Sequence, residues 1–191
     1  MRLVTVSVLA LALASAAFAQ ESVAGQRREN QQERIGNGVA NGSLTAGETT
    51  HLERQEAGIN HEIRHDRLAN GGKLTNQERR QINRQQNRMS REIYRDKHNA
   101  ARQRYGNNEV GARRENQQDR IANGIKSGQL TAGETARLEG HQAAINREVY
   151  RDRAANGGRL TAGERARVNR QQNRQSANIY RKKHNGVVGS R

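Results

Sequence analysis

Four long segments of the chain carry apolar residues at helical spacing. In each, an anchor residue is followed seven positions later by a second and four positions after that by a third. The anchors are Leu52, Ile59 and Ile63; Ile82, Met89 and Ile93; Leu138, Ile145 and Val149; and Val168 and Ile179, with the polar Gln175 as an exception at the second position of the last segment. Positions i, i+7 and i+11 share one face of an α-helix, and no comparable alternation with a period of two is present. The pattern predicts an all-α protein.

The order of the segments repeats along the chain. RRENQQERI at 27–35 returns as RRENQQDRI at 113–121, an offset of 86 that also relates the other repeated phrases. The repetition predicts a duplication, with one copy at 20–105 and the second at 106–191. Each copy is expected to hold three helices joined by helix–turn–helix hairpins. The predicted helices lie at 24–36, 46–68, 76–101, 110–123, 132–154 and 162–184.

Each predicted helix carries too few apolar anchors to be stable alone. Helices this polar are marginal in water, so the hairpins must close or the two copies must pack on each other. Assembly into a homo-oligomer is a further way to bury these stripes.

The phrase SGQLTAGE at 127–134 is one of four near copies that precede predicted helices. In each, a Thr is followed three residues later by a Glu, the spacing of a capping box. The glycines upstream are suited to the left-handed turn that ends the preceding helix. The predicted helix caps are Thr45 and Glu48, Thr75 and Glu78, Thr131 and Glu134, and Thr161 and Glu164.

The same phrases have the Gly, aliphatic and Glu spacing of the second half of an EF-hand loop. The first half lacks the ligands, because no carboxylate stands at positions 1, 3 or 5 of any copy, and Arg67 and Arg153 occupy position 1 in two of them. Calcium requires several anionic oxygens. We therefore predict EF-hand-like turns without calcium ligands and no cofactor, with a degenerate calcium-responsive protein as an alternative.

Residues 61–65 read His-Glu-Ile-Arg-His, the H-E-x-x-H pattern found in zincin metalloproteases. The equivalent segments at 91–95 and 147–151 have arginine at both histidine positions, so the pattern is a variant of an R-E-x-x-R repeat. His61 and His65 remain weak candidates for transition-metal binding, because histidines four apart on a helix can chelate. No catalytic residue and no enzymatic activity are predicted.

The N-terminal residues have the pattern of a secretory signal peptide. Arg2 precedes an apolar run, and small residues flank Phe18 just before a predicted cut after Ala19. We expect residues 1–19 to be removed and the protein to be periplasmic or secreted. No later apolar segment is long enough to cross a bilayer, so a transmembrane protein is not predicted.

Composition narrows the chemistry that the chain can perform. There is no Cys, Pro or Trp, which removes disulfides and thiolate sites. Lys and Arg number 34 against 19 Asp and Glu, for a formal net charge of +15 at pH 7. Such a charge favours anionic partners, although a GC-rich genome could also enrich arginine.

The arginines gather on predicted helix faces. On an ideal helix, four near the C-terminus fall within about 60° of one another, and three have equivalents in the first copy. These candidate anion-binding residues are Arg167, Arg170, Arg174 and Arg181, with Arg84, Arg88 and Arg95. The expected partners are anionic polymers or membrane-surface groups. Sequence-specific nucleic-acid binding is not expected, because aromatic stacking platforms are lacking.

The motif R-I-x-x-G-x-x-x-G-x-L-T-x-x-E at 34–48 resembles exported proteins of Gram-negative bacteria with duplicated GxLTxxE helical repeats, whose activity is uncharacterised. LTNQERRQI at 74–82 is similar to the LTxxQ phrase of periplasmic stress chaperones, with Glu78 in place of the Gln. We therefore expect a non-enzymatic exported protein that binds an anionic envelope or extracellular component. An LTxxQ-like periplasmic chaperone is the alternative.

Overall fold

A computed structural model describes residues 24–187 and residue 189, and this part of the chain contains six α-helices and no strand. The all-α prediction is confirmed. The predicted signal peptide lies outside the described residues. An N-terminal helix at 24–40 is followed by α2 (Ala46–Ala69), α3 (Asn76–His98), α4 (Glu109–Ser127), α5 (Ala132–Ala155) and α6 (Ala162–Lys183).

Two helices continue past the glycines at which the sequence predicted them to end. The N-terminal helix reaches residue 40 instead of 36, and α4 reaches Ser127 instead of 123. A Cβ on Gly38 would lie 2.6 Å from Cδ1 of Leu44, and one on Gly124 would lie 2.6 Å from Cδ1 of Leu130. These glycines therefore serve close packing within the helix and do not terminate it.

All four LT phrases start helices with complete capping boxes. At α5, the backbone N–H of Glu134 donates to Oγ1 of Thr131 at 3.2 Å, and the Thr131 N–H donates to the Glu134 carboxylate at 3.2 Å. The same pair of bonds is present at the starts of α2, α3 and α6. The leucines of the phrases are buried in the core. Each phrase thus closes a turn and orients the helix that follows it.

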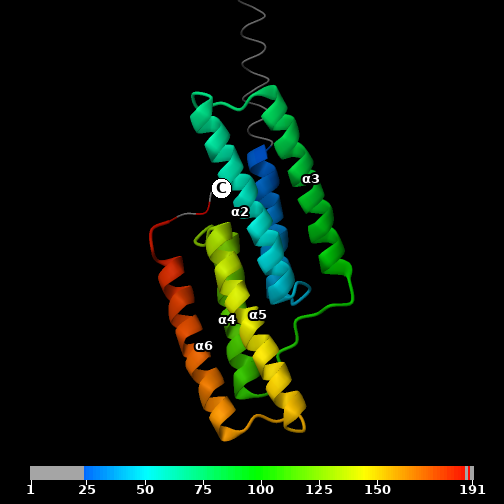
Figure 1. Cartoon of the computed structure of the whole chain (residues 1–191), viewed down its shortest axis with the longest axis vertical. Coiled ribbons are helices and arrows are strands. Elements are labelled where there is room, and N and C mark those ends of the chain that lie inside the picture. The colour runs from blue at the N-terminus through cyan, green and yellow to red at the C-terminus, as the bar shows by residue number, and fades with distance from the viewer. Residues whose placement is uncertain (1–23, 188, 190–191) are drawn as a thin grey trace, which may run out of the picture.

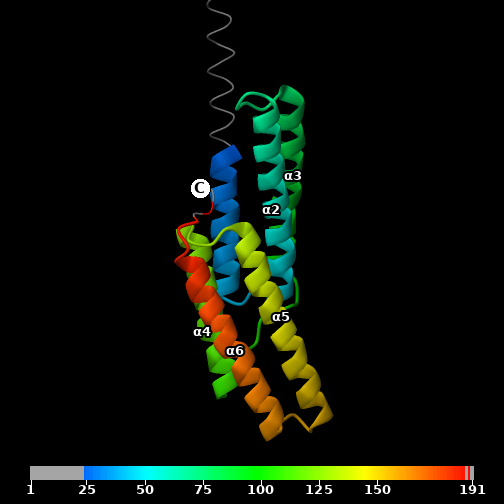
Figure 2. The same ribbon diagram turned by 60° about the vertical axis from the view of Figure 1, so that its left-hand side comes forward.

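The two sets of three helices pack into one elongated bundle (Figure 1). The N-terminal halves of α2 and α5 lie side by side at its centre and run in opposite directions, with the methyl group of Thr50 3.9 Å from the Cβ position of Gly140. Among α2 to α6, α2 and α5 form the most extensive contact. Figure 2 shows the same central pair from another side. The two sets of three helices therefore pack on each other.

A continuous apolar cluster joins the two sets of helices, and a smaller one lies among α4, α5 and α6. Every anchor predicted from the helical spacing is buried, including Gln175, which is 2% exposed. Gln175 donates through Nε2 to the backbone oxygen of Leu138 at 2.9 Å. The amide replaces an aliphatic anchor because it finds a buried acceptor.

Buried glutamines form a polar layer that the apolar pattern did not predict. Nε2 of Gln31 donates to the oxygen of Gln86 at 2.8 Å and to Oγ of Ser90 at 2.7 Å. Gln117 makes the same two bonds, at the same lengths, to the residues 86 positions later in the second set of helices.

Between residues 24 and 187, no helix has the length and apolarity required to span a bilayer.

Candidate anion-binding site

A groove of about 850 Å³ lies where the two sets of helices meet. Its walls are the start of α2, the connection from α3 to α4, and the C-terminal half of α5. Among its described lining residues there is no carboxylate. The five basic residues that line it are Arg102, Arg104, Arg114, Arg147 and Arg153.

Gln103 joins the walls of this groove. Its backbone N–H donates to the oxygen of Gly42 at 2.9 Å, which returns the chain after α3 to the turn before α2. Its side-chain oxygen accepts from the N–H of Ala46 at 3.3 Å and from Nδ2 of Asn146 at 3.4 Å. One side chain therefore holds the start of α2 against α5.

A close backbone contact fixes the connection over the first turn of α4. A Cβ on Gly111 would lie 2.2 Å from the oxygen of Gly106 and 2.4 Å from the oxygen of Tyr105. Only glycine permits this approach without a shift of the backbone. The contact places the half-buried ring of Tyr105 beside the guanidinium of Arg114, 5.7 Å from the ring centroid.

Arg114 is the most buried arginine of the groove, with 6% of its surface exposed. Its Nη2 donates to the backbone oxygen of Arg104 at 3.3 Å, and its Nε is buried without a hydrogen-bond partner. Burial lowers the pKa of Arg114, and the positive charge of Arg153 adds to this effect. No carboxylate of the described chain forms an ion pair with it. Arg114 is therefore a buried cation that lacks a counter-ion.

The arginine 86 positions earlier has a different environment. Arg28 donates through Nη1 to Oδ1 of Asn60 at 3.1 Å, and the nearby charge of Glu56 opposes the lowering of its pKa by burial. The residue equivalent to Glu56 is Gln142, which donates to Gln117 at 2.9 Å. The second half of the chain therefore has an amide where the first half has the carboxylate.

Two of the remaining arginines of the groove donate to neutral oxygen acceptors. Arg102 donates to the backbone oxygens of Asn99 and Ala101, at 2.7 Å and 2.8 Å. Arg153 donates to the side-chain oxygen of Asn108 at 3.2 Å. These neutral acceptors orient the guanidinium groups without neutralising them. The groove thus combines positive potential with oriented donors, which is the chemistry required to bind an anion.

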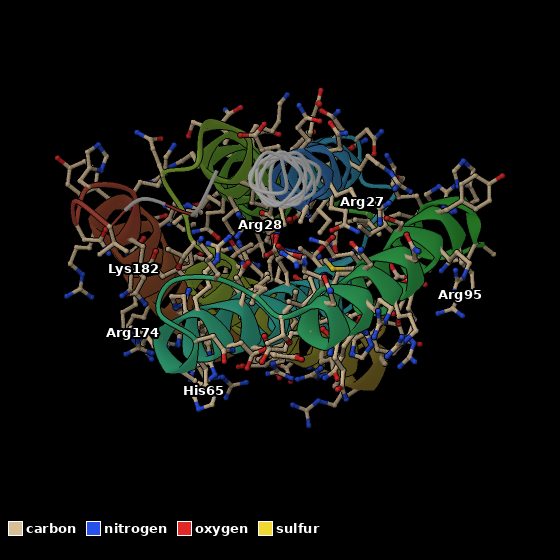
Figure 3. The ribbon with its side chains drawn as sticks, turned by 90° about the horizontal axis from the view of Figure 1, so that it is seen from above. Arg27, Arg28, His65, Arg95, Arg174 and Lys182 are labelled. Atoms are coloured by element: carbon tan, nitrogen blue, oxygen red, sulfur yellow. The ribbon has the colours of Figure 1, made fainter. Side chains whose placement is uncertain are left out.

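The arginines predicted from the sequence lie elsewhere, on two separate faces. Arg84, Arg88 and Arg95 belong to α3, whereas Arg167, Arg170, Arg174 and Arg181 belong to α6. These helices occupy opposite outer sides of the bundle (Figure 1). Viewed from above, the labelled Arg95 and Arg174 extend outward on opposite sides (Figure 3). The structure does not bring the two sets together.

Two of these predicted residues are neutralised by carboxylates. Arg95 lies 3.5 Å from both Glu92 and Asp96. Arg167 contacts Glu148 at 2.5 Å and Asp152 at 2.8 Å. Carboxylates on α3 and across the α5–α6 contact therefore lie beside two of the predicted arginines. Arg84, Arg88, Arg170 and Arg174 are exposed.

The H-E-x-x-H segment lies on the outer surface of α2. His61 and His65 are exposed, and the labelled His65 points away from the bundle (Figure 3). Glu62 accepts hydrogen bonds from Gln81 at 2.6 Å and Gln85 at 2.8 Å, so its carboxylate links α2 to α3. Within the described residues, no group of three or more His, Cys, Asp or Glu side chains is arranged to hold a metal ion.

The turns compared with calcium loops are helix ends stabilised by backbone hydrogen bonds. The N–H of Gly72 donates to the oxygen of Arg67 at 2.7 Å, and Gly158 makes the same bond to Arg153. Such bonds, with glycine in a left-handed conformation, are typical of helix C-caps. The two arginines at the first loop position therefore belong to the last turns of α2 and α5.

The groove was not predicted from the sequence because its residues come from three distant segments. One signal was present in the repeat itself: Glu56 becomes Gln142, whereas Arg28 is retained as Arg114. The buried arginine thus keeps its place in the second half, whereas the carboxylate of the first half is replaced by an amide. Comparison with protein-family models, curated proteins and solved structures found no match.

Proposed function

We propose that the protein is a non-enzymatic, exported helical protein that binds an anionic ligand in the arginine-lined groove. The observation that carries the proposal is Arg114, a buried guanidinium with no carboxylate partner. Burying an unpaired charge is costly, and the cost is recovered only when a counter-charge is supplied. An anion that enters the groove provides this counter-charge. The charge of the Arg114 guanidinium is therefore unpaired when the groove is empty and paired when an anion is bound.

The groove favours phosphate, sulfate or carboxylate groups carried on a larger molecule. Guanidinium forks match the planar oxygens of these groups and bind them through paired hydrogen bonds. The first turn of α2 lines the same groove and adds the positive end of a helix dipole. Five arginines exceed what one small anion requires, which supports an anionic polymer or a multiply charged envelope component.

Two other functions, those of a chaperone and of a calcium-responsive protein, require features that can be compared with the described chain. A chaperone requires exposed apolar surface, and the large apolar side chains exposed in the described chain are scattered over separate elements. A calcium-responsive protein requires several carboxylates in each loop, and the turns of this chain have none at positions 1, 3 and 5. No contact in the described chain favours either function over anion binding.

The proposal is tested by comparing two double variants of equal charge change. Arg114→Gln with Arg147→Gln alters the groove, whereas Arg170→Gln with Arg174→Gln alters the exposed face of α6. Binding of dextran sulfate is measured by titration calorimetry at fixed ionic strength, with uncharged dextran as the ligand control. Two lost charge-assisted hydrogen bonds, each about 1.5 kcal/mol or more, predict at least about a hundredfold loss of affinity for the groove variant.

The α6 variant is expected to lose about twofold or less, because exposed charges are screened by salt. Equal losses in the two variants would show that binding is diffuse and would overturn the groove as the site. Equal binding of dextran and dextran sulfate would overturn the anionic class of ligand.

A further inference from the structure

Three glutamates lie buried where the two sets of helices meet, close to the centre of the bundle. Glu53 and Glu56 belong to α2, and Glu139 belongs to α5; all three are at most 1% exposed. Glu53 and Glu139 are equivalent positions, and each accepts one hydrogen bond from a glutamine, Gln32 at 3.2 Å and Gln118 at 2.9 Å. The anion groove does not use these carboxyl groups.

The pair formed by Glu56 and Gln31 lacks a hydrogen-bond donor that the equivalent pair in the second half has. In the second half, Nε2 of Gln142 donates to Oε1 of Gln117 at 2.9 Å. The equivalent pair in the first half is Glu56 and Gln31, and both Oε2 of Glu56 and Oε1 of Gln31 are buried without a partner. Two acceptors cannot bond to each other. A single hydrogen at Glu56 would restore the bond that the second half makes.

We propose that Glu56 is a proton-binding site: its carboxyl group is protonated in the folded protein and donates to Oε1 of Gln31, as the amide of Gln142 donates to Gln117. The proton takes the place of the amide hydrogen, and nothing else in the equivalent arrangement has to change. This inference rests on the helix interface alone and does not depend on anion binding in the groove.

Charged groups approach Glu56 from several packed elements. The N-terminal helix contributes Arg28, whose charge opposes protonation, and α5 contributes Glu139 to the same carboxyl layer. Figure 3 shows Arg28 among the side chains toward the middle of the bundle. A cavity of about 770 Å³ beside Glu56 is also lined by charged groups on three helices, namely Glu29, Glu33, Arg64 and Lys126. On α3, the backbone oxygen of Gln86 accepts from Gln31 at 2.8 Å, and this residue is uncharged.

The direction of the carboxyl pKa values agrees with the geometry. Burial raises the pKa of Glu56 from 4.5 to about 7, against the opposing effect of Arg28. Burial also raises the pKa of Glu139 to about 8 and that of Glu53 well above its ordinary value. These groups hold protons in the folded chain that the unfolded chain releases. The stability that these bound protons give to the fold is fully present below pH 4.5, and it is lost as pH rises through the pKa values of the folded state.

The duplicated chain supplies a matched pair of variants. Glu56→Gln makes the first half like the second, and Gln142→Glu makes the second half like the first. Urea unfolding of the full chain is followed by circular dichroism between about pH 5.5 and pH 8. With the folded and unfolded pKa values given above, one proton changes the unfolding equilibrium constant by about 30-fold over this range.

Glu56→Gln is expected to remove this factor of about 30 from the change of the unfolding equilibrium constant between pH 5.5 and pH 8. Gln142→Glu is expected to add a similar factor to that change. An unchanged pH dependence in Glu56→Gln would overturn the proposal. Infrared spectroscopy provides a second measurement on the folded proteins: the carbonyl band of a protonated carboxyl at pH 6 should weaken in Glu56→Gln. A band of unchanged intensity would also contradict the proposal, whatever the effect on stability.

Discussion

Replacement of Arg114 by methionine tests whether this arginine serves the fold or a ligand. Methionine keeps much of the side-chain volume and removes the charge. The change loses a long hydrogen bond to the Arg104 oxygen and the contact with Tyr105, together about 2 kcal/mol. Burying a cation with no counter-ion costs several kcal/mol, and the substitution removes this cost. We therefore expect Arg114→Met to stabilise the empty protein by about 1–2 kcal/mol.

The control for this experiment is the equivalent change in the first half of the chain. Arg28 is hydrogen-bonded to Asn60 and lies beside Glu56, so Arg28→Met should destabilise the protein by about 1–2 kcal/mol through an unsatisfied acceptor. Both free energies of unfolding are measured in urea at pH 8.5 without added polyanion, because Glu56, with a pKa of about 7, is then ionised. If Arg114→Met is as destabilising as Arg28→Met, then Arg114 is a structural residue and the argument for an anion site fails.

Two further predictions concern the construction of the groove and the capping boxes. Gly111→Ala should destabilise the protein by about 1–3 kcal/mol, because its Cβ meets backbone oxygens that cannot move freely; dextran sulfate affinity should fall as well, and an unchanged affinity would show that the connection at 102–106 does not form the site. Hydrogen bonds from Thr75 and Thr161 lower the pKa of Glu78 and Glu164. The stability that these caps provide is present above the unfolded value near 4.5 and is lost as pH falls through the folded values. Because the buried glutamates act in the opposite direction, thermal stability should be greatest near pH 4–5. In a series of melting curves, a maximum above pH 7 would contradict the assignment of the buried glutamates, and a stability that rises as pH falls below 4 would contradict the role of the caps.

The elements governed by local rules could be predicted from the sequence. The anchors at i, i+7 and i+11 predicted which faces are buried, since apolar residues at that spacing share one side of a helix. The Thr and Glu pairs predicted the helix starts, since a capping box involves residues only three positions apart. The end predicted for the N-terminal helix, at residue 36, was wrong. Gly36 and Gly38 allow close packing against Lys126 and Leu44 from other segments, which the sequence pattern does not reveal.

The polar interior and the groove depend on contacts between distant segments, which the pattern of one chain does not contain. Gln31 and Gln117 are indistinguishable from surface glutamines until their acceptors on α3 and α6 are known. The arginines of α6 looked like the most concentrated basic face, but the neutralisation of Arg167 requires the acidic residues of α5.

The most direct test of the central claim follows the arginine Nε–H signals of the folded protein by NMR during titration with inorganic pyrophosphate. The account predicts that the Arg114 signal shifts and saturates at lower pyrophosphate concentration than the signals of Arg170 and Arg174, because the groove offers several converging donors. A stationary Arg114 signal, or one that moves in step with those of α6, would contradict a focused anion site at the seam.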